Sequence, residues 1–213
     1  MDFPKVIFLD FDGVICESCG IKNDAYYNSY IKFGHEIAQK ALDYHLLHGG
    51  ISRVKLFPEL HKMFLGREIT EEEHVKMCEN FTLMVEKAVV EAPLVNGVET
   101  FLKEYHSKTF FFVSSGTPED EMRRIVEKKQ LSMYFKTVFG SPDTKETHIL
   151  NVLKEYEISP QNALFVGDAT TDRDAAKNTG IRFLARLSPD RLLEDEKFKI
   201  EDFNSIVDTI SKM

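Results

Sequence analysis

The feature of this sequence that most constrains its fold is a set of short apolar runs, each rich in β-branched or aromatic residues and each ending at small or acidic residues. Such runs are typical of strands that are buried on both faces of a parallel sheet. They lie at Val6 to Leu9, Thr109 to Val113, Ala163 to Val166 and Ile181 to Ala185, with a further candidate at Thr137 to Phe139. Helical patterns separate them, as at Ile149, Val152, Leu153 and Tyr156. The alternation predicts an α/β fold with a doubly wound, Rossmann-like parallel sheet.

The chain between the first two runs is too long for a simple crossover. Residues 16–92 contain no convincing strand, although a connection between parallel strands needs only about a dozen residues. Helical patterns cover Ala25 to Leu47 and Val54 to Phe64, and Thr70 with Glu73 forms a capping box that opens another helix. We therefore predict a catalytic core formed by residues 1–15 and 93–213 and an inserted helical cap domain formed by residues 16–92.

Composition narrows the classes of partner. The net charge is −8, with 35 acidic against 27 basic residues, which disfavours nucleic acid and anionic membranes as partners. No apolar stretch approaches the roughly 18 residues that a membrane span needs. The run from Val6 is closed by Asp10, so it indicates a strand and not a signal peptide. We expect a soluble, cytoplasmic protein.

The number of cysteines indicates a protein of a reducing compartment. Their number is odd, at Cys16, Cys19 and Cys78, whereas a secreted disulfide framework normally has an even count. Cys16 and Cys19 have the spacing of a redox or zinc pair, yet no second pair completes a tetrahedral site. We expect thiols in a linker, and we expect His45, His61 and His74 to be surface residues.

The strongest chemical feature is Asp10-Phe11-Asp12-Gly13, directly after the first apolar run. Carboxyl ends of strands are where α/β folds bind ligands. Two carboxylates held there repel each other, raise each other's pKa and attract a cation. A calcium loop is excluded because the remaining ligand positions and the closing Glu are missing. A solvated turn remains the alternative for this motif taken alone.

A second acidic cluster follows the run that ends at Val166. It contains Asp168 and Asp172 and again places carboxylates at the carboxyl end of a strand. Several carboxylates around a hard cation suit Mg²⁺, which keeps some waters and takes other oxygens from a substrate phosphate.

Two weaker signals accompany these clusters. Ser114, Ser115 and Gly116 end a strand just before Thr117-Pro118, which predicts a helix capped at Thr117 and hence an anion site at its N-terminus. Lys145 precedes the helix that contains Ile149. Singly, the first is also typical of a plain turn and the second of an exposed lysine.

Together, the four motifs resemble the haloacid dehalogenase superfamily of aspartate-nucleophile phosphotransferases. The family pattern is Asp-x-Asp-Gly, then Ser or Thr after a strand, then Lys, then Gly-Asp-x-x-x-Asp. It is matched in order by Asp10 and Asp12, Ser114, Lys145, and Asp168 and Asp172. The resemblance extends from the N-terminus to about Ala185 and also accounts for a helical cap inserted after the first motif.

The resemblance implies a role for each matched residue. Asp10 attacks phosphorus and forms an aspartyl phosphate, and Asp12 is the acid and base. Mg²⁺ is held by the Asp10 carboxylate, the Asp12 main-chain carbonyl and Asp168, with Asp172 ligating directly or through water. Ser114 and Lys145 hold phosphoryl oxygens, and Lys145 also pairs with Asp10. Ser115 and Gly116 are further substrate-binding candidates.

The inserted segment contains a candidate substrate loop. His48-Gly49-Gly50-Ile51-Ser52-Arg53 resembles the substrate loop of β-phosphoglucomutases, so His48, Ser52 and Arg53 are candidate substrate residues, with Arg53 as a clamp for a second anionic group. A helix-connecting turn with a solvated arginine is the alternative. Lys22 stands where the mutases usually have histidine; this departure weakens the mutase interpretation and makes Lys22 another candidate substrate contact.

The sequence thus predicts a Mg²⁺-dependent phosphomonoester hydrolase for a small phosphorylated metabolite, a sugar phosphate or a small phosphorylated acid. Asp12 disfavours the dehalogenase and phosphonatase branches, because an acid at that position serves an oxygen leaving group. A phosphosugar mutase is the alternative within the family. A phospho-accepting signalling receiver is the alternative from another class, although receivers place two adjacent acids after the first strand and have no such insertion. An inactive binding protein has little reason to keep all these charges together.

Overall fold

The protein is built around a six-stranded sheet in which every strand is parallel to its neighbours. The computed structural model describes residues 3–189 and 193–213. The strands are β1 (Val6–Leu9), β2 (Phe110–Pro118), β3 (Phe135–Ser141), β4 (Ala163–Gly167), β5 (Arg182–Arg186) and β6 (Lys199–Ile200). Their spatial order is β3-β2-β1-β4-β5-β6. The α/β fold with a doubly wound parallel sheet is confirmed.

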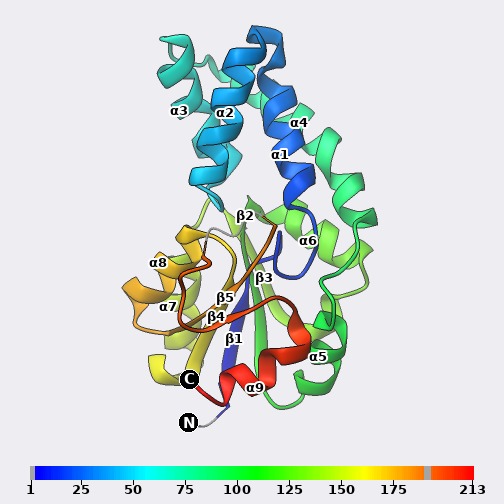
Figure 1. Cartoon of the computed structure of the whole chain (residues 1–213), viewed down its shortest axis with the longest axis vertical. Helices are drawn as coiled ribbons and strands as arrows, with labels where there is room; N and C mark the ends of the chain where they lie inside the picture. Colours follow the sequence, from blue (N-terminus) through cyan, green and yellow to red (C-terminus); the bar gives the residue numbers. More distant parts are fainter. Residues whose placement is uncertain (1–2, 190–192) are drawn as a thin grey trace.

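Helices cover both faces of this sheet. The helices α7 (Lys145–Glu155) and α8 (Thr170–Thr179) pack on one face, and α5 (Val98–Tyr105), α6 (Glu119–Lys128) and α9 (Ile206–Ile210) pack on the other (Figure 1). Alternate residues of β1 supply the two cores: Ile7 and Leu9 face α5 and α6, whereas Val6 and Phe8 face α7 and α8. The first strand is therefore buried on both sides, which explains its unbroken apolar sequence.

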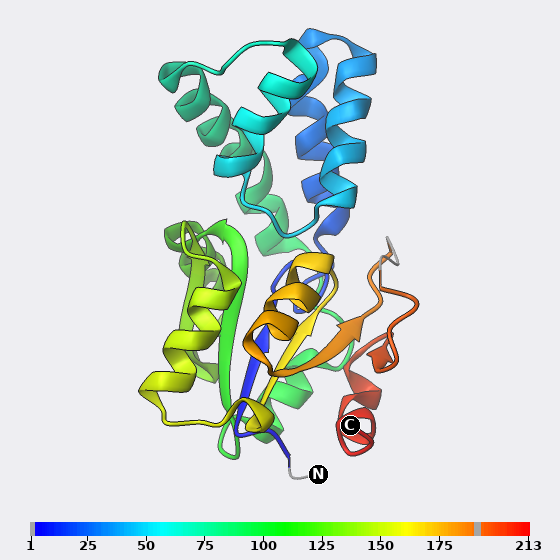
Figure 2. The same cartoon turned by 90° about the vertical axis from the view of Figure 1, so that its left-hand side faces the viewer.

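Four helices between β1 and α5 form a separate layer beyond the carboxyl ends of the strands, at the top of Figure 1. They are α1 (Cys19–Tyr30), α2 (His35–Leu47), α3 (Arg53–Leu60) and α4 (Glu71–Glu91), and α3 continues into a π-helical turn, His61–Leu65. In Figure 2 the loop between α2 and α3, drawn in cyan, descends from this layer toward α8. We call these four helices and their connections the cap.

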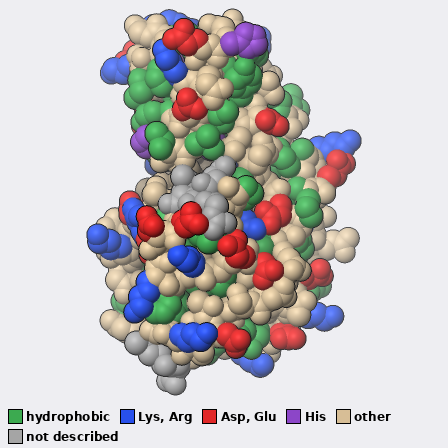
Figure 3. Space-filling model, in the orientation of Figure 1, with side chains coloured by type: hydrophobic (Ala, Val, Ile, Leu, Met, Phe, Trp, Pro, Cys, Tyr) green, Lys and Arg blue, Asp and Glu red, His purple; other side chains and the backbone are tan. Residues whose placement is uncertain are grey.

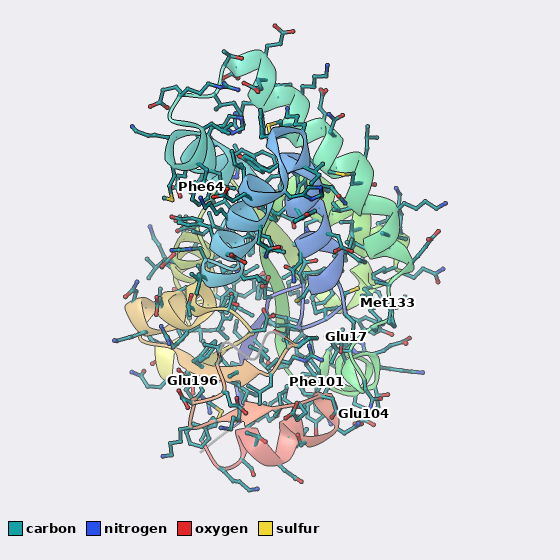
Figure 4. All side chains as sticks on the ribbon, turned by 45° about the horizontal axis from the view of Figure 1, so that its top comes forward. Glu17, Phe64, Phe101, Glu104, Met133 and Glu196 are labelled. Atoms are coloured by element: carbon teal, nitrogen blue, oxygen red, sulfur yellow. The ribbon has the colours of Figure 1, made fainter. Side chains whose placement is uncertain are left out.

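The cap joins the core through a connection that is fixed by an arginine. Glu17, labelled in Figure 4 below α1, forms an ion pair with Arg186 at the end of β5. The Nη1 of Arg186 also donates to the carbonyl of Gly13 at 2.9 Å. Both contacts hold the chain where it leaves the core for the cap.

Several local predictions need correction. The second strand runs to Pro118, so Ser114 to Thr117 belong to an irregular strand end, where the register with β3 shifts. The helix after it begins at Glu119, and Thr117 is not its cap. The short strand β6 was not predicted, because two residues carry no periodic signal.

The cap interior also differs from expectation. His61 was expected on the surface, yet it is fully buried, with Nδ1 2.8 Å from the hydroxyl of Tyr30. Thr70 caps α4 as predicted by accepting from the N–H of Glu73 at 3.2 Å. The carboxylate of Glu73 pairs with Arg67 at 2.8 Å.

In the orientation of Figure 3, hydrophobic side chains gather over the cap, whereas acidic and basic side chains are interspersed over the core. Among the described residues, no helix combines the length and apolar character required to cross a membrane. The three cysteines form no disulfide in this part of the chain.

Candidate active site

The candidate site lies where the winding direction of the sheet reverses. The strand β1 has β2 on one side and β4 on the other. Asp10 follows β1, Asp168 follows β4, and Ser114 to Thr117 end β2. Because parallel strands end at the same edge of the sheet, three separate segments meet at this switch point, which is where α/β sheets bind ligands.

Three buried carboxylates and one lysine form the charged centre. The carboxylate oxygens of Asp10, Asp168 and Asp172 lie within 4.8 Å of one another. Lys145, the first residue of α7, places Nζ 3.2 Å from Asp10 Oδ2 and also pairs with Asp172. The N–H of Phe11 donates to Asp10 Oδ1 at 2.7 Å. Asp10 is thus held by two donors, and the sequence prediction that Lys145 pairs with it agrees with this geometry.

The pKa values reflect this crowding. Burial raises the pKa of Asp10 well above its ordinary value, and Asp172 and Asp168 raise it further, although Lys145 opposes them. Burial and the charge of Asp172 raise the pKa of Asp168 to about 7. Burial alone lowers the pKa of Lys145, but Asp10 and Asp172 outweigh it and hold that pKa above its ordinary value. The centre carries more negative charge than its single lysine neutralises.

Asp12 points away from this cluster, toward the cap. Its Oδ1 accepts from the hydroxyl of Ser18 at 2.6 Å, and its Oδ2 lies 3.4 Å from Nζ of Lys22 on α1. Lys22 also donates to the hydroxyl of Thr117 at 2.9 Å. The predicted substrate residue Lys22 therefore connects the cap with two segments of the core.

The end of β2 places its two serines differently. Ser114 is fully buried, with Oγ 2.8 Å from Nδ1 of His148 on α7, whereas Ser115, Gly116 and Thr117 line the cavity above Asp10. Burial lowers the pKa of His148 to about 4, so this ring is neutral near pH 7. His148 could not be identified from the sequence, because a lone histidine on an amphipathic helix is typical of many core positions.

The loop between α2 and α3 closes over the site from the cap. Gly50 approaches so closely that a Cβ there would lie 2.2 Å from Thr171 Oγ1, and one on Gly116 would lie 2.2 Å from the carbonyl oxygen of Gly50. Thr171 donates to the carbonyl of Gly49 at 2.7 Å. The hydroxyl oxygen of Ser52 in the cap lies 2.9 Å from that of Ser141 in the core. The cap is therefore closed on the core.

Two other candidates of this loop have partners within the protein. The ring of His48 stacks on Tyr44, with centroids 4.0 Å apart, and its Nδ1 lies 2.9 Å from the Tyr44 carbonyl. Arg53, the first residue of α3, is buried and pairs with Glu121 of the core helix α6 at 2.5 Å. The alternative prediction for Arg53, a solvated arginine in a turn between two helices, is therefore wrong, because Arg53 is buried at the start of α3.

A cavity between cap and core contains most of these groups. Its lining includes residues that sequence reasoning missed, because their positions in the cap depend on tertiary packing: Cys19, Asn23, Tyr26, His45, Leu46, Ile51 and Phe81. The rings of Tyr26 and His45 stack with centroids 3.9 Å apart. The cavity thus has a floor with carboxylates supplied by the core and a mixed roof supplied by the cap, in which aromatic and aliphatic side chains lie beside Lys22, Asn23 and Arg53.

A model of the haloacid dehalogenase-like hydrolase family matches residues 6–186. The chain belongs to this family. The resemblance drawn from the four motifs is confirmed, and so is the expectation of an enzyme. None of the curated proteins compared with the chain matches it significantly.

Solved structures of the same fold span almost the whole chain. A β-phosphoglucomutase from Clostridium difficile has a TM-score of 0.75 at 17% identity and covers 99% of this chain and 98% of its own. A protein described as a predicted phosphoglycolate phosphatase from Haemophilus somnus has a TM-score of 0.76 at 16% identity, with 98% of each chain covered. A haloacid dehalogenase superfamily hydrolase from Geobacter sulfurreducens has a TM-score of 0.65 at 21% identity, covering 97% and 96%. At these identities the likeness concerns the fold.

The residues of this haloacid dehalogenase-like hydrolase fit a magnesium ion. The donors at the charged centre are carboxylate oxygens from Asp10, Asp168 and Asp172, the ligand type that this hard cation takes. Burial and the neighbouring Asp172 disfavour a negative charge on Asp168 and raise its pKa, and a bound cation would relieve this. Space beside the centre is kept by Gly13, where a Cβ would lie 2.1 Å from Asp168 Oδ2.

Proposed function

We propose that this protein is a Mg²⁺-dependent phosphomonoester hydrolase that acts on a small phosphorylated metabolite through an aspartyl phosphate on Asp10. The observation that carries the proposal is the meeting of Asp10, Lys145, Asp168 and Asp172 at one charged centre, from which Asp10 and Asp168 line a cavity that the cap closes. When bound, Mg²⁺ shields the attacking carboxylate from the anionic phosphate. Asp10, Asp168 and the main-chain carbonyl of Asp12 would hold it, with Asp172 ligating directly or through water.

In the first step a carboxylate oxygen of Asp10 attacks phosphorus, and the bond from phosphorus to the ester oxygen breaks. Asp12 gives its proton to the departing oxygen, which leaves as an alcohol. Lys145, with Ser115 and Gly116 at the end of β2, holds phosphoryl oxygens and stabilises their charge. Ser114 was expected to do the same, but its buried hydroxyl contacts His148 and it supports the strand end from behind. The ammonium of Lys145 already lies 3.2 Å from Asp10, so nucleophile and phosphate share one counter-charge.

In the second step water attacks phosphorus of the aspartyl phosphate. Asp12 takes the proton of this water, the bond from phosphorus to Asp10 breaks, and inorganic phosphate is released. Ser18 and Lys22 hold the carboxylate of Asp12, so an element of the cap positions the acid and base. The sequence candidates His48 and Ser52 are not among the described residues that line the cavity, because His48 stacks on Tyr44 and Ser52 contacts Ser141. They hold the closing loop in place and are not proposed as substrate contacts.

A phosphosugar mutase is the second candidate, supported by the Gly-Ile-Ser-Arg sequence of the closing loop. It requires that the phosphoenzyme meet a sugar phosphate before it meets water. A signalling receiver no longer competes, because the chain belongs to a hydrolase family.

A phosphate-release screen tests the proposal. Phosphorylated metabolites are incubated with the protein in Mg²⁺ or in EDTA, and isomerisation of glucose 1-phosphate is followed beside it. We expect phosphate release that requires Mg²⁺ and exceeds isomerisation. Faster isomerisation than hydrolysis would favour the mutase.

The variant Asp10→Asn tests the nucleophile. It should lower kcat by about a thousandfold or more, because the acyl phosphate cannot form. Asp24→Asn, on the exposed face of α1, is the matched control and should keep full activity. Circular dichroism establishes that both variants are folded, and turnover retained by Asp10→Asn would refute the mechanism.

A further inference from the structure

The cations that line the cavity already have acidic partners inside the protein. In the described part of the chain these cations are Lys22 and Arg53. Lys22 lies 3.4 Å from Asp12, and Arg53 lies 2.5 Å from Glu121. Asp10, Asp12 and Asp168 line the same cavity. A ligand that enters therefore meets no uncompensated positive charge from these two side chains.

The pair of Arg53 and Glu121 is two-pronged and buried. The Nη1 of Arg53 donates to Glu121 Oε1 at 3.3 Å, and Nη2 lies 2.5 Å from Oε2. The hydroxyl of Thr82, on α4, accepts from Arg53 at 2.6 Å and donates to Glu121 at 2.9 Å. Side chains of both ions are at most 5% exposed. This geometry satisfies both carboxylate oxygens and two of the arginine nitrogens.

Recruiting Arg53 to a second anionic group of a substrate would disrupt this arrangement. Glu121 would then be left buried without its counter-charge, which is strongly unfavourable. If Glu121 instead stayed paired with Arg53, the anionic group of the substrate would lie near the Glu121 carboxylate at low dielectric and would be repelled by it. Either way, Glu121 opposes a charged leaving group.

The other walls around Arg53 suit an uncharged group. Its guanidinium lies over the ring of Phe81, 5.0 Å from the centroid, and Tyr26 meets Phe81 edge-on with centroids 4.9 Å apart. Leu46 and Ile51 add aliphatic surface to the same cavity. A neutral alcohol fits this surface and can still hydrogen-bond to the lining amide of Asn23, whereas a carboxylate or second phosphate would be desolvated against it without an unpaired cation among the described lining residues.

We propose that Glu121 is a specificity-determining residue, which neutralises Arg53 and thereby selects phosphomonoesters whose leaving group carries no charge. The inference rests on the proposed function, because it assigns the substrate class of that same site. It disfavours phosphorylated acids and sugar bisphosphates. A phosphosugar mutase must bind a doubly phosphorylated sugar, so the same pair of residues also opposes that activity.

Two phosphonates of similar size test the proposal without turnover. In Mg²⁺, calorimetry compares 2-hydroxyethylphosphonate, which has a neutral tail, with phosphonoacetate, which has a second anionic group. We expect the wild type to bind the hydroxyl compound about tenfold more tightly, since the difference is one charged contact. In Glu121→Gln the ratio of the two dissociation constants should shift by at least about tenfold toward phosphonoacetate, because Arg53 is released.

The controls separate charge from structure. The double variant Glu121→Gln with Arg53→Gln should lose the gain for phosphonoacetate, and Asp120→Asn, an exposed acid on the same helix turn, should behave as the wild type. If Glu121 merely held the cap closed, both phosphonates would weaken equally and the ratio would stay constant. That result would overturn the inference and leave the proposed function intact.

The wild type alone also decides the question should Glu121→Gln not fold. A wild-type preference for phosphonoacetate would overturn the inference directly. Binding of neither phosphonate to the wild type would contradict a phosphoryl site in this cavity, so both the inference and the proposed function would be wrong.

Discussion

The contact between Ser114 and His148 joins two buried side chains and bears on the protonation of the histidine ring. Ser114 has no exposed surface and His148 is 2% exposed, and their polar atoms lie 2.8 Å apart. Phe139 stacks on the histidine ring with centroids 4.9 Å apart. A neutral imidazole suits these surroundings, whereas an imidazolium would be costly.

This burial predicts a pH dependence of stability. The unfolded state binds a proton on His148 below about pH 6.5, whereas the folded state does not until about pH 4, so acid favours unfolding between these values. Between pH 8 and pH 5 the wild type should lose about 2 kcal/mol of unfolding free energy through this residue. Urea unfolding at both pH values should show a loss that is smaller by this amount in His148→Gln.

The histidines of the cap contribute to the same slope and make the control necessary. Burial lowers the pKa of His45 to about 4 and also lowers that of His61. His106→Gln, at an exposed position, should keep the wild-type slope. An unchanged slope in His148→Gln would show that the ring binds a proton as readily in the folded protein as in the unfolded chain, which contradicts the lowered pKa.

At the scale of elements, the closing loop between α2 and α3 decides the shape of the site. It reaches the core through backbone and small side chains: Gly49 with Thr171, Gly50 with Gly116, and Ser52 with Ser141. Glycine is required at both ends of the closest approach, because a methyl group would meet a carbonyl or a hydroxyl oxygen. Closure of the loop on the core thus depends on glycine, which has no side chain, at positions 50 and 116.

The variant Gly116→Ala should hold the loop open. Its Cβ would lie 2.2 Å from the carbonyl oxygen of Gly50, so the loop must withdraw. We expect kcat/KM for the best substrate of the screen to fall by about a hundredfold, since small displacements of positioning elements have effects of this size. Gly20→Ala, with no atom within 4 Å of the added Cβ, should leave kcat/KM unchanged. Wild-type activity in Gly116→Ala would mean that closure is not needed.

The elements also show what the sequence can and cannot predict. Strand ends and helix starts are local, so the positions of Asp10, Lys145 and Asp168 followed from apolar runs and helix patterns. The pairing of Arg53 with Glu121 joins residues 68 positions apart and depends on how the cap meets the core. No periodicity carries that information. The irregular end of β2 was missed for a related reason, because Ser, Gly and Thr are typical of turns as well as of strand bulges.

At the scale of the whole molecule, function and stability oppose each other at the charged centre. The fold brings three carboxylates within 4.8 Å of one another at the ends of two strands and the start of a helix. Lys145 offsets part of this charge. The remaining repulsion is a cost that folding bears without a cation, and it is relieved when a cation binds.

This opposition yields a prediction for Asp168→Asn. In EDTA at neutral pH the variant should be more stable than the wild type, by on the order of 1 kcal/mol, because one of three crowded charges is removed. Mg²⁺ should raise the Tm of the wild type and raise that of the variant far less, because a ligand is lost. Thermal unfolding measures both effects, with Asp24→Asn as a control that retains the wild-type response. Equal Mg²⁺-induced increases in Tm for the wild type and Asp168→Asn would place the ion elsewhere. A variant that is more stable but inactive would mean that the carboxylates are retained for catalysis although they lower the stability of the fold.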